Sequence, residues 1–481
     1  MVYVLHGFDS YLSRDLSVYT YAGQQVLDGV PPYVGVLNRA GPLAHLLPAV
    51  GIAGARALGR PDLLGARVFY LLIAVACVWV MYLAGRDLLG TRTAGLVAAA
   101  TLLSFHGFVE YAADGPREKT PMVLFVVCTV WALTRRRWLA AGLSLGLATL
   151  VLQLGFIVGA PAVLVCALAD PRGRRLRALG LVVLGGALPV AAALAYFAVV
   201  GALSQALDAF VVINVQYTSA DPMTAHLRAD WALLREGYGA TLWVLVAGLV
   251  ALLVLSVRAS RPVVRAHEPE AVTVAALGVA AVVGIAWTLH DFDSWPDVFT
   301  LLPLSALGVT ATWRWASRRL RVGPAAALAL AWVLVAAGLG LTFSVTQRSD
   351  TLLLQRRSVA AKLSVLPPGA TMMTVNAPQP LVLSGRTSPT RYLMFASGLD
   401  EYVDATWPGG LQGFGRWIVR RAPSLVAVGE PRRHWLSEAL RADYRRVGSA
   451  PGWVWYADRD LGHRTLQLLR AARTPHLAGP G

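Results

Sequence analysis

The fold is decided by apolar stretches such as residues 66–85, which read ARVFYLLIAVACVWVMYLAG. This stretch has roughly the 20 residues that a helix needs to cross a bilayer. Similar stretches follow at about 93–112, 120–134, 138–152, 154–168, 177–200, 240–256, 271–289, 298–313 and 324–343. With 56% hydrophobic residues, 15% charged residues and a mean hydropathy of +0.55, the chain is predicted to be a mainly α-helical membrane protein, with about ten spans over residues 66–344.

The positive charge of the chain predicts how these spans are oriented. The formal net charge is +16, but the arginines form short clusters between the apolar stretches and no single basic face, so nucleic acid is not an expected partner. The clusters are Arg86 with Arg92, Arg135–Arg137, Arg172–Arg177, Arg258–Arg265 and Arg314–Arg321. By the positive-inside rule these five loops are cytoplasmic, and we expect a multi-pass protein of the plasma (inner) membrane.

The remaining loops are then expected outside the cytoplasm. They are residues 114–119, 201–239 and 290–297, together with the C-terminal region from about 345. Residues 1–65 are expected there as well, as a first outer loop whose segment 42–57 lies on the membrane as an interfacial helix. Span 66–85 must run inward and nothing precedes residue 1 to carry the loop across. We therefore expect that a first membrane helix is missing from this sequence.

Residues 345–481 are expected to form a small extracytoplasmic α/β domain. The short apolar segments 370–375, 424–428 and 452–456 are typical of buried strands, and they alternate with helical patterns at 351–365 and 433–441.

Acidic side chains collect at the outer ends of the spans and are nearly absent from the span interiors. An ion-coupled carrier usually needs carboxylates or broken helices near the midplane of the bilayer. The pattern therefore favours chemistry at one membrane face over passage through the membrane.

Asp15 is the first candidate for that chemistry. A sugar transfer to a hydroxyl needs a general base, and Asp15 is followed by Tyr19 and Tyr33, which offer ring surface and hydroxyl donors. Asp15 also opens the periodic helical stretch Leu16–Leu27, where an acidic helix cap is common. The spacing alone favours the cap.

Two outer loops hold the other candidates. In the first loop, which reads Asp114-Gly115-Pro116-Arg117-Glu118-Lys119, Arg117 and Lys119 are suited to neutralising a phosphate, and Glu118 to acting as a base, binding a sugar hydroxyl or holding a metal. A solvated helix start explains this loop equally well. In the second loop, a tryptophan beside carboxylates suits a sugar-binding surface, and equally an interfacial aromatic belt; these residues are Asp293, Trp295 and Asp297.

Taken together, these features resemble the GT-C membrane glycosyltransferases, in particular the branch of glycosyltransferase family 39 that includes polyprenyl-phosphate mannosyltransferase-like and aminoarabinose-transferase-like enzymes. The resemblance covers most of the chain but rests on degenerate patterns. They are Asp15-Leu16-Ser17-Val18-Tyr19, Pro32-Tyr33, Gly41-Pro42-Leu43, Ala141–Ala148, Asn214-Val215-Gln216-Tyr217 and Phe292–Phe299.

The resemblance implies a polytopic GT-C fold and an inverting enzyme that takes a sugar, expected to be mannose, from a polyprenyl-phosphate donor. It implies that Asp15 is the catalytic base and that the second acidic site is Glu118, with Asp114 as the alternative. The cations expected near phosphate are Arg14, Arg39, Arg117 and Lys119, where Arg39 substitutes for a basic residue that the family often has at the position of Ala40.

The acceptor is expected to be a glycan, a lipid or a protein, with membrane lipids as further partners. No cofactor is implied with certainty, and a divalent metal (Mg or Mn) stays open. The alternative function is a non-catalytic carrier or assembly protein that binds lipid-linked sugar and retains the GT-C fold.

Overall fold

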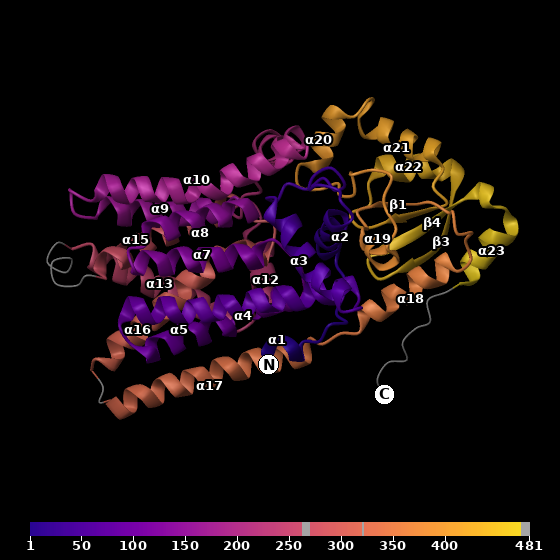
Figure 1. Cartoon of the computed structure of the whole chain (residues 1–481). Helices are drawn as coiled ribbons and strands as arrows, with labels where there is room; N and C mark the ends of the chain where they lie inside the picture. Colours follow the sequence, from indigo (N-terminus) through magenta and orange to yellow (C-terminus); the bar gives the residue numbers. More distant parts are fainter. Residues whose placement is uncertain (262–269, 320–321, 473–481) are drawn as a thin grey trace. The chain divides into compact units, whose positions relative to one another are not determined.

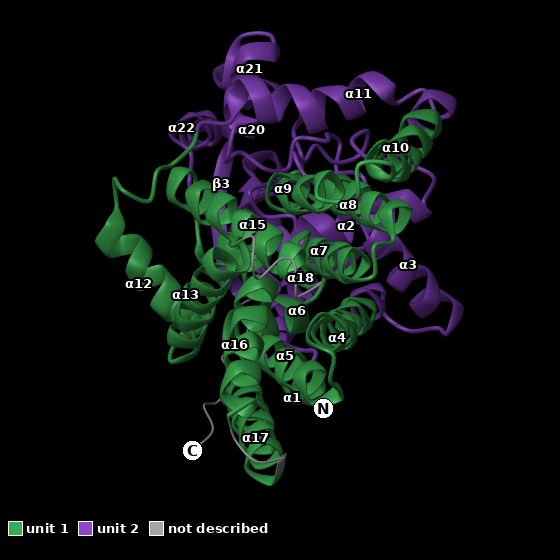
Figure 2. Cartoon of the chain, turned by 90° about the vertical axis from the view of Figure 1, so that its left-hand side faces the viewer, with its two compact units in different colours: residues 1–6, 68–196, 220–347 green, residues 7–67, 197–219, 348–481 purple. Residues whose placement is uncertain are grey.

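The computed structural model describes residues 1–261, 270–319 and 322–472, so Arg265 and Arg321 of the expected cytoplasmic loops lie outside the described residues. The chain forms two compact units (Figure 2). Unit 1 comprises residues 1–6, 68–196 and 220–347, and unit 2 comprises residues 7–67, 197–219 and 348–481. The expected segments 1–65, 66–344 and 345–481 divide the chain differently, because a local pattern does not show which distant segments pack together.

Unit 1 is built mainly from apolar helices, most of which run alongside one another (Figure 1). They are α1 (Val2–Leu5), α4 (Asp62–Leu89), α5 (Arg92–Ser104), α6 (His106–Asp114), α7 (Lys119–Thr134), α8 (Trp138–Val151), α9 (Leu154–Leu168), α10 (Arg175–Val199), α12 (Leu227–Tyr238), α13 (Thr241–Ala259), α15 (Ala271–His290), η2 (Trp295–Thr300), α16 (Leu301–Ser317) and α17 (Val322–Thr346). A helix therefore forms over every stretch that the sequence indicated as a span.

Among the described residues, five helical stretches are long and apolar enough to cross a membrane: Asp62–Leu89, Arg175–Val199, Thr241–Ala259, Ala271–His290 and Gly323–Leu363. Helices α5 and α6 make a sixth if they form one span that bends by 70°. Helices α7, α8 and α9 have only 16, 14 and 15 residues, fewer than the roughly 20 of a full crossing. The expected number of ten spans therefore stays a prediction.

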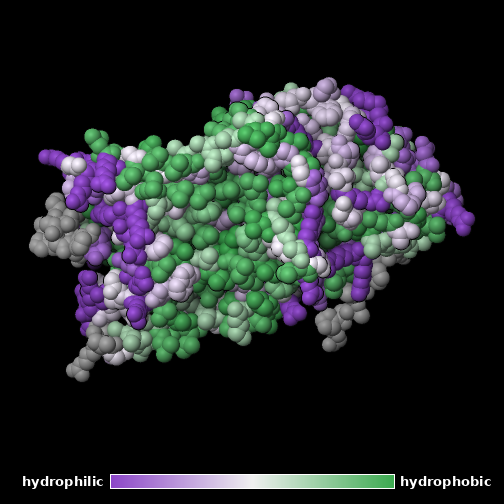
Figure 3. Space-filling view, viewed as in Figure 1, coloured by the Kyte–Doolittle hydropathy of each residue, from purple (hydrophilic) through white to green (hydrophobic). Residues whose placement is uncertain are grey.

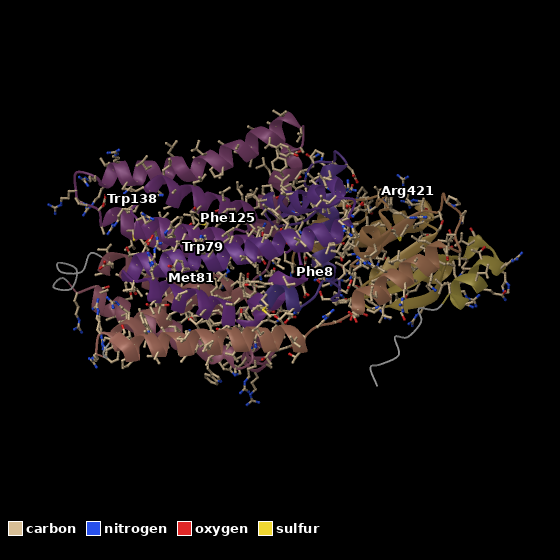
Figure 4. All side chains as sticks on the ribbon, turned by 60° about the horizontal axis from the view of Figure 1, so that its bottom comes forward. Phe8, Trp79, Met81, Phe125, Trp138 and Arg421 are labelled. Atoms are coloured by element: carbon tan, nitrogen blue, oxygen red, sulfur yellow. The ribbon has the colours of Figure 1, made fainter. Side chains whose placement is uncertain are left out.

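Three of the arginine clusters meet at one end of unit 1. Arg135 Nη1 lies 3.4 Å from the carboxylate of Asp87 near the end of α4, and Arg136 Nη1 lies 3.9 Å from that of Asp170 just after α9. Trp138 of α8 lies at this end too (Figure 4). Hydrophilic side chains gather there, whereas hydrophobic side chains cover the helices (Figure 3). This division is typical of a helix bundle with one charged end at a membrane face.

Helices α13 and α16 pack closely because Gly308 of α16 faces Gly248 of α13. A Cβ added to Gly308 of α16 would lie 1.9 Å from the carbonyl oxygen of Gly248 of α13. Small residues let helices in a bilayer approach this closely, since van der Waals packing drives their association.

We expect Gly308→Ala to lower stability by about 2 kcal/mol, because the two backbones must separate to admit the methyl group. The control is Gly338→Ala in α17, where an added Cβ has nothing within 4 Å. The control should be neutral or slightly stabilising, since alanine favours helix. Thermal unfolding of both variants in detergent measures the difference, and equal melting temperatures would contradict the packing described.

Unit 2 combines a small sheet with helices from three parts of the chain. Its elements are α2 (Arg14–Leu27), α3 (Leu43–Ala57), α11 (Leu203–Leu207), η1 (Asp208–Tyr217), α18 (Thr351–Leu363), β1 (Met372–Val375), α19 (Gln379–Ser384), α20 (Leu399–Thr406), α21 (Gly410–Arg421), β2 (Leu425–Val428), α22 (His434–Asp443), β3 (Tyr444–Ala450), β4 (Trp453–Asp458), η3 (Arg459–Leu461) and α23 (His463–Ala471). The strand order is β1-β2-β4-β3, with β1 and β2 parallel and the other pairs antiparallel.

The three expected strands and both expected helices of the C-terminal region are present, as β1, β2, β4, α18 and α22. Strand β3 was missed because its sequence, YRRVGSA, does not read as a buried strand. Both arginines of β3 are exposed, and a register shift between Arg446 and Gly448 interrupts the pairing with β4.

The N-terminal segment belongs to the same unit as this sheet. The side-chain amide of Gln355 accepts a hydrogen bond from the backbone N–H of Leu12 at 2.9 Å and donates one to the carbonyl of Leu12 at 2.9 Å. The same amide nitrogen donates to the carbonyl of Pro451 at 3.0 Å. One buried glutamine thus joins the chain before α2, the helix α18 and the turn before β4.

Candidate active site

Asp15 lies in the first turn of α2 and is not the helix cap. The cap is Ser13, whose extended backbone precedes the helix and whose Oγ accepts a hydrogen bond from the backbone N–H of Leu16 at 3.3 Å. A serine in this position is one of the preferred caps. The interpretation of Asp15 as the cap is therefore wrong, and its carboxylate is not needed for that purpose.

The carboxylate of Asp15 is partly exposed beside a cation. Arg14 Nε lies 3.2 Å from Asp15 Oδ1, and the two side chains are 29% and 35% exposed. Arg14 Nη1 also donates to the carbonyl of Glu430 at 3.4 Å, in the loop that follows β2. Asn376, which follows β1, donates through Nδ2 to the carbonyl of Pro431 in that loop at 3.1 Å. The start of α2 is thus held at the carboxyl ends of the two parallel strands, which is where ligands bind in many open α/β sheets.

Both tyrosine candidates of the N-terminal segment are buried. Tyr33 is fully buried, its hydroxyl donates to the carbonyl of Ala40 at 2.8 Å, and its ring centroid lies 4.7 Å from that of His45. Tyr19 is 6% exposed. The carbonyl of Arg39 accepts a hydrogen bond from Asn214 Nδ2 of η1 at 2.9 Å. We therefore assign Tyr33 to the core that shapes the loop, because its hydroxyl already has an acceptor.

In unit 1, Tyr111 of α6 organises the loop that contains Glu118. The hydroxyl of Tyr111 donates to Glu118 Oε1 at 3.2 Å, and Glu118 is only 9% exposed. The guanidinium of Arg117 lies 4.1 Å from the centroid of the Tyr111 ring, a cation–π geometry. Tyr111 was not among the residues predicted from the sequence, because its place in α6 gives no local sign that its hydroxyl reaches Glu118.

Lys119 and Asp297 form an ion pair between the two predicted outer loops. Their side chains are only 12% and 18% exposed. Asp297 Oδ2 also accepts hydrogen bonds from the backbone N–H groups of Asp293 and Ser294, each at 2.8 Å, which caps η2. Burial alone would raise the pKa of Asp297, but Lys119 and these two N–H groups hold that pKa below its usual value. The charges of Lys119 and Asp297 therefore neutralise each other and hold the two predicted outer loops together.

Trp295 packs inside unit 1. Its ring centroid lies 6.1 Å from that of Tyr111 and 6.2 Å from that of Tyr238, both edge to face. A Cβ added to Gly107 or Gly237 would lie 2.8 Å or 2.4 Å from this indole, so both glycines are needed for the contact. This packing favours a structural use of Trp295 over sugar binding.

The carboxylate of Asp114 lies 3.2 Å from His6 Nε2. Asp293 is exposed at the start of the loop that Asp297 caps.

The structure thus gathers the predicted residues into two groups. Asp15, Arg14, Tyr19, Tyr33 and Arg39 belong to unit 2, and the other candidates belong to unit 1, namely Asp114, Arg117, Glu118, Lys119, Asp293, Trp295 and Asp297. Within the described part of the chain, no group of three or more His, Cys, Asp or Glu side chains is arranged to hold a metal ion. We therefore assign no residue to Mg or Mn.

Comparisons with known proteins agree with this architecture. Residues 47–202 match the family described as dolichyl-phosphate-mannose-protein mannosyltransferase. The crystal structure of ArnT from Cupriavidus metallidurans in the apo state superimposes with a TM-score of 0.63 at 13% identity, over 99% of this chain and 97% of ArnT. The chain therefore has the fold of that ArnT.

A second structure of the same ArnT, bound to undecaprenyl phosphate, gives a TM-score of 0.63 at 15% identity over 95% of this chain and 96% of ArnT. No curated protein sequence matches this chain. The long apolar helices make it an integral membrane protein that crosses the bilayer several times.

Proposed function

We propose that this protein transfers a sugar, with mannose as the expected one, from a polyprenyl-phosphate donor to a glycan, lipid or protein acceptor outside the cytoplasm. Three observations support the donor class. The fold is that of ArnT, one structure of that protein contains undecaprenyl phosphate, and residues 47–202 match a family described by dolichyl-phosphate-mannose.

The proposal depends above all on one observation, which is that the carboxylate of Asp15 is partly exposed and does not cap its helix. Ser13 caps the helix in its place, Asp15 stays partly exposed, and the resemblance assigns the catalytic base to this position. In the proposed step, Asp15 takes the proton of an acceptor hydroxyl while the acceptor oxygen bonds to the anomeric carbon. The bond from that carbon to the phosphate oxygen breaks, polyprenyl phosphate leaves, and the configuration inverts.

Glu118 is proposed as the second acidic residue in preference to Asp114. Tyr111 fixes one oxygen of Glu118 by a hydrogen bond, whereas Asp114 is engaged by His6. Arg14, Arg39 and Arg117 are proposed as the cations near the leaving phosphate. Lys119 is better suited to holding its loop, because Asp297 already neutralises its charge.

The sidedness of the protein has a direct test. In a variant without the three native cysteines, we expect Asp293→Cys to react with a membrane-impermeant maleimide in intact cells, since the positive-inside rule places its loop outside. Arg172→Cys, in an arginine loop, should react only after the cells are permeabilised. The reverse labelling pattern would overturn the orientation, and with it the proposed outer site.

The donor class is tested by offering the protein polyprenyl-phosphate mannose, polyprenyl-diphosphate mannose and a nucleotide-linked mannose in parallel. We expect sugar transfer from the first donor only. Binding of polyprenyl phosphate with no turnover of any donor would favour the alternative, a carrier or assembly protein that retains the fold.

A further inference from the structure

Unit 2 contains a pocket that the proposed transfer reaction does not use. It has a volume of about 230 Å³ and lies between α22 and the sheet. Its walls include Val428 of β2, Tyr456 of β4, Leu436 and Leu440 of α22, and two arginines, Arg432 and Arg441. Drug-sized ligands need pockets of roughly 300 Å³ or more, so this pocket suits a group the size of a single ring.

Two arginines line the pocket, Arg432 and Arg441. Among the described residues, the guanidinium of Arg441 has no acidic or hydrogen-bonding partner. Arg432 is paired with Glu430 at 3.0 Å, but these side chains are 47% and 72% exposed, and such a pair is worth little in water. An incoming anion can therefore recruit both guanidinium groups at small cost, and guanidinium groups bind carboxylate and phosphate oxygens well.

The rest of the pocket suits a ring. Leu436, Leu440 and Val428 are buried and provide an apolar floor, and the phenol of Tyr456 is partly exposed beside them. The rim is fixed in place, because Arg459 donates to the carbonyls of both Arg441 at 3.1 Å and Tyr444 at 3.4 Å.

We propose that this pocket binds a monosaccharide ring that carries an oxyanion, either a carboxylate or a phosphate. The guanidinium groups of Arg432 and Arg441 bind the oxyanion, and the apolar floor and Tyr456 contact the ring. The pocket is connected to the proposed base by one short loop, since Glu430, two residues before Arg432, accepts the hydrogen bond from Arg14. The binding itself does not depend on the transfer reaction.

The test is binding to the full-length protein in detergent, followed by calorimetry or ligand-observed NMR. The probes are glucuronate, glucose 6-phosphate and neutral glucose. We expect at least one charged sugar to bind with a dissociation constant on the order of 1 mM or tighter, and glucose at least tenfold more weakly. Which charged probe binds more tightly identifies the oxyanion.

Arg441→Gln should weaken this binding at least tenfold, whereas Arg441→Lys should retain part of it. Neither variant should change the melting temperature, because no described residue pairs with this guanidinium. The matched control is Arg420→Gln, an exposed arginine of α21 outside the pocket, which should leave binding unchanged. Equal binding of glucose and the charged sugars, no binding at about 10 mM, or full binding by Arg441→Gln would overturn the proposal.

Discussion

Asp15→Asn is expected to lower the turnover rate of sugar transfer by a factor of about 10² to 10⁴, the usual contribution of a positioned general base. The amide keeps the size of the side chain but cannot accept the proton of the acceptor hydroxyl. Since Ser13 caps the helix, α2 should fold normally in the variant. The measurement is the rate of label transfer from polyprenyl-phosphate mannose, with the melting temperature of each preparation recorded alongside.

The matched control for this variant is Asp28→Asn at the other end of α2. Asp28 pairs with Arg56 at 2.9 Å, but their side chains are 48% and 40% exposed, so the loss of this pair costs about 1 kcal/mol at most. Transfer by Asp28→Asn should stay within about twofold of the wild type, since 1 kcal/mol or less in stability leaves the folded population nearly unchanged. If Asp15→Asn behaves like Asp28→Asn, Asp15 is not the base.

Lys119→Met is expected to destabilise unit 1 by about 3 kcal/mol. The substitution leaves the carboxylate of Asp297 without its cation in a place that is only 18% exposed, and breaking a largely buried ion pair costs about this much. The double variant Lys119→Met with Asp297→Asn should lose less stability than the sum of the two single variants, by about 1–3 kcal/mol. Equilibrium unfolding in detergent gives the three values, and strict additivity would contradict the pairing.

The pH dependence of this pair follows from the lowered pKa of Asp297. A carboxylate with a lowered pKa in the folded state stabilises the protein above its unfolded pKa, and this contribution is lost as the pH falls through the folded pKa. The stability difference between wild type and Asp297→Asn should therefore be constant between about pH 5 and pH 8, and should shrink below about pH 4. A difference that disappears near pH 6 would contradict this assignment.

The helical architecture could be predicted because a membrane-spanning helix satisfies its own backbone hydrogen bonds, so its pattern is local. The strands β1, β2 and β4 could be predicted for a related reason, since each is a short buried apolar segment. Strand β3 could not, because its exposed arginines obscure the pattern.

The candidate site could be predicted only as separate pieces. Asp15 and Glu118 could be predicted from the sequence. That Ser13 caps α2 and that Tyr111 binds Glu118 could not, because several hydrogen-bonding groups lie near each position in the sequence and only the folded chain shows which of them forms the bond. Nothing in the sequence indicates that Gln355 binds Leu12, since the two positions are 343 residues apart.

The two lysines of this arginine-rich chain both make specific contacts of this kind. Of the 43 basic residues, only Lys119 and Lys362 are lysines; Lys362 is buried, Lys119 is partly buried, and both make specific contacts. Lys362 donates to the carbonyls of Val447 and Ala472, each at 2.9 Å, and to that of Leu469. A compact ammonium group fits where a planar guanidinium does not, so the rare lysines mark tight sites in this arginine-rich chain.

The proposed reaction is tested most directly by measuring both of its products at once. Purified protein is supplied with polyprenyl-phosphate mannose and acceptor-containing membranes, and the free polyprenyl phosphate and the transferred sugar are counted. The wild-type protein should produce the two in equal amounts, with inverted configuration at the anomeric carbon, and Asp15→Asn should produce neither above background. Release of polyprenyl phosphate at the same rate by both proteins, or no release by either, would contradict the proposed reaction.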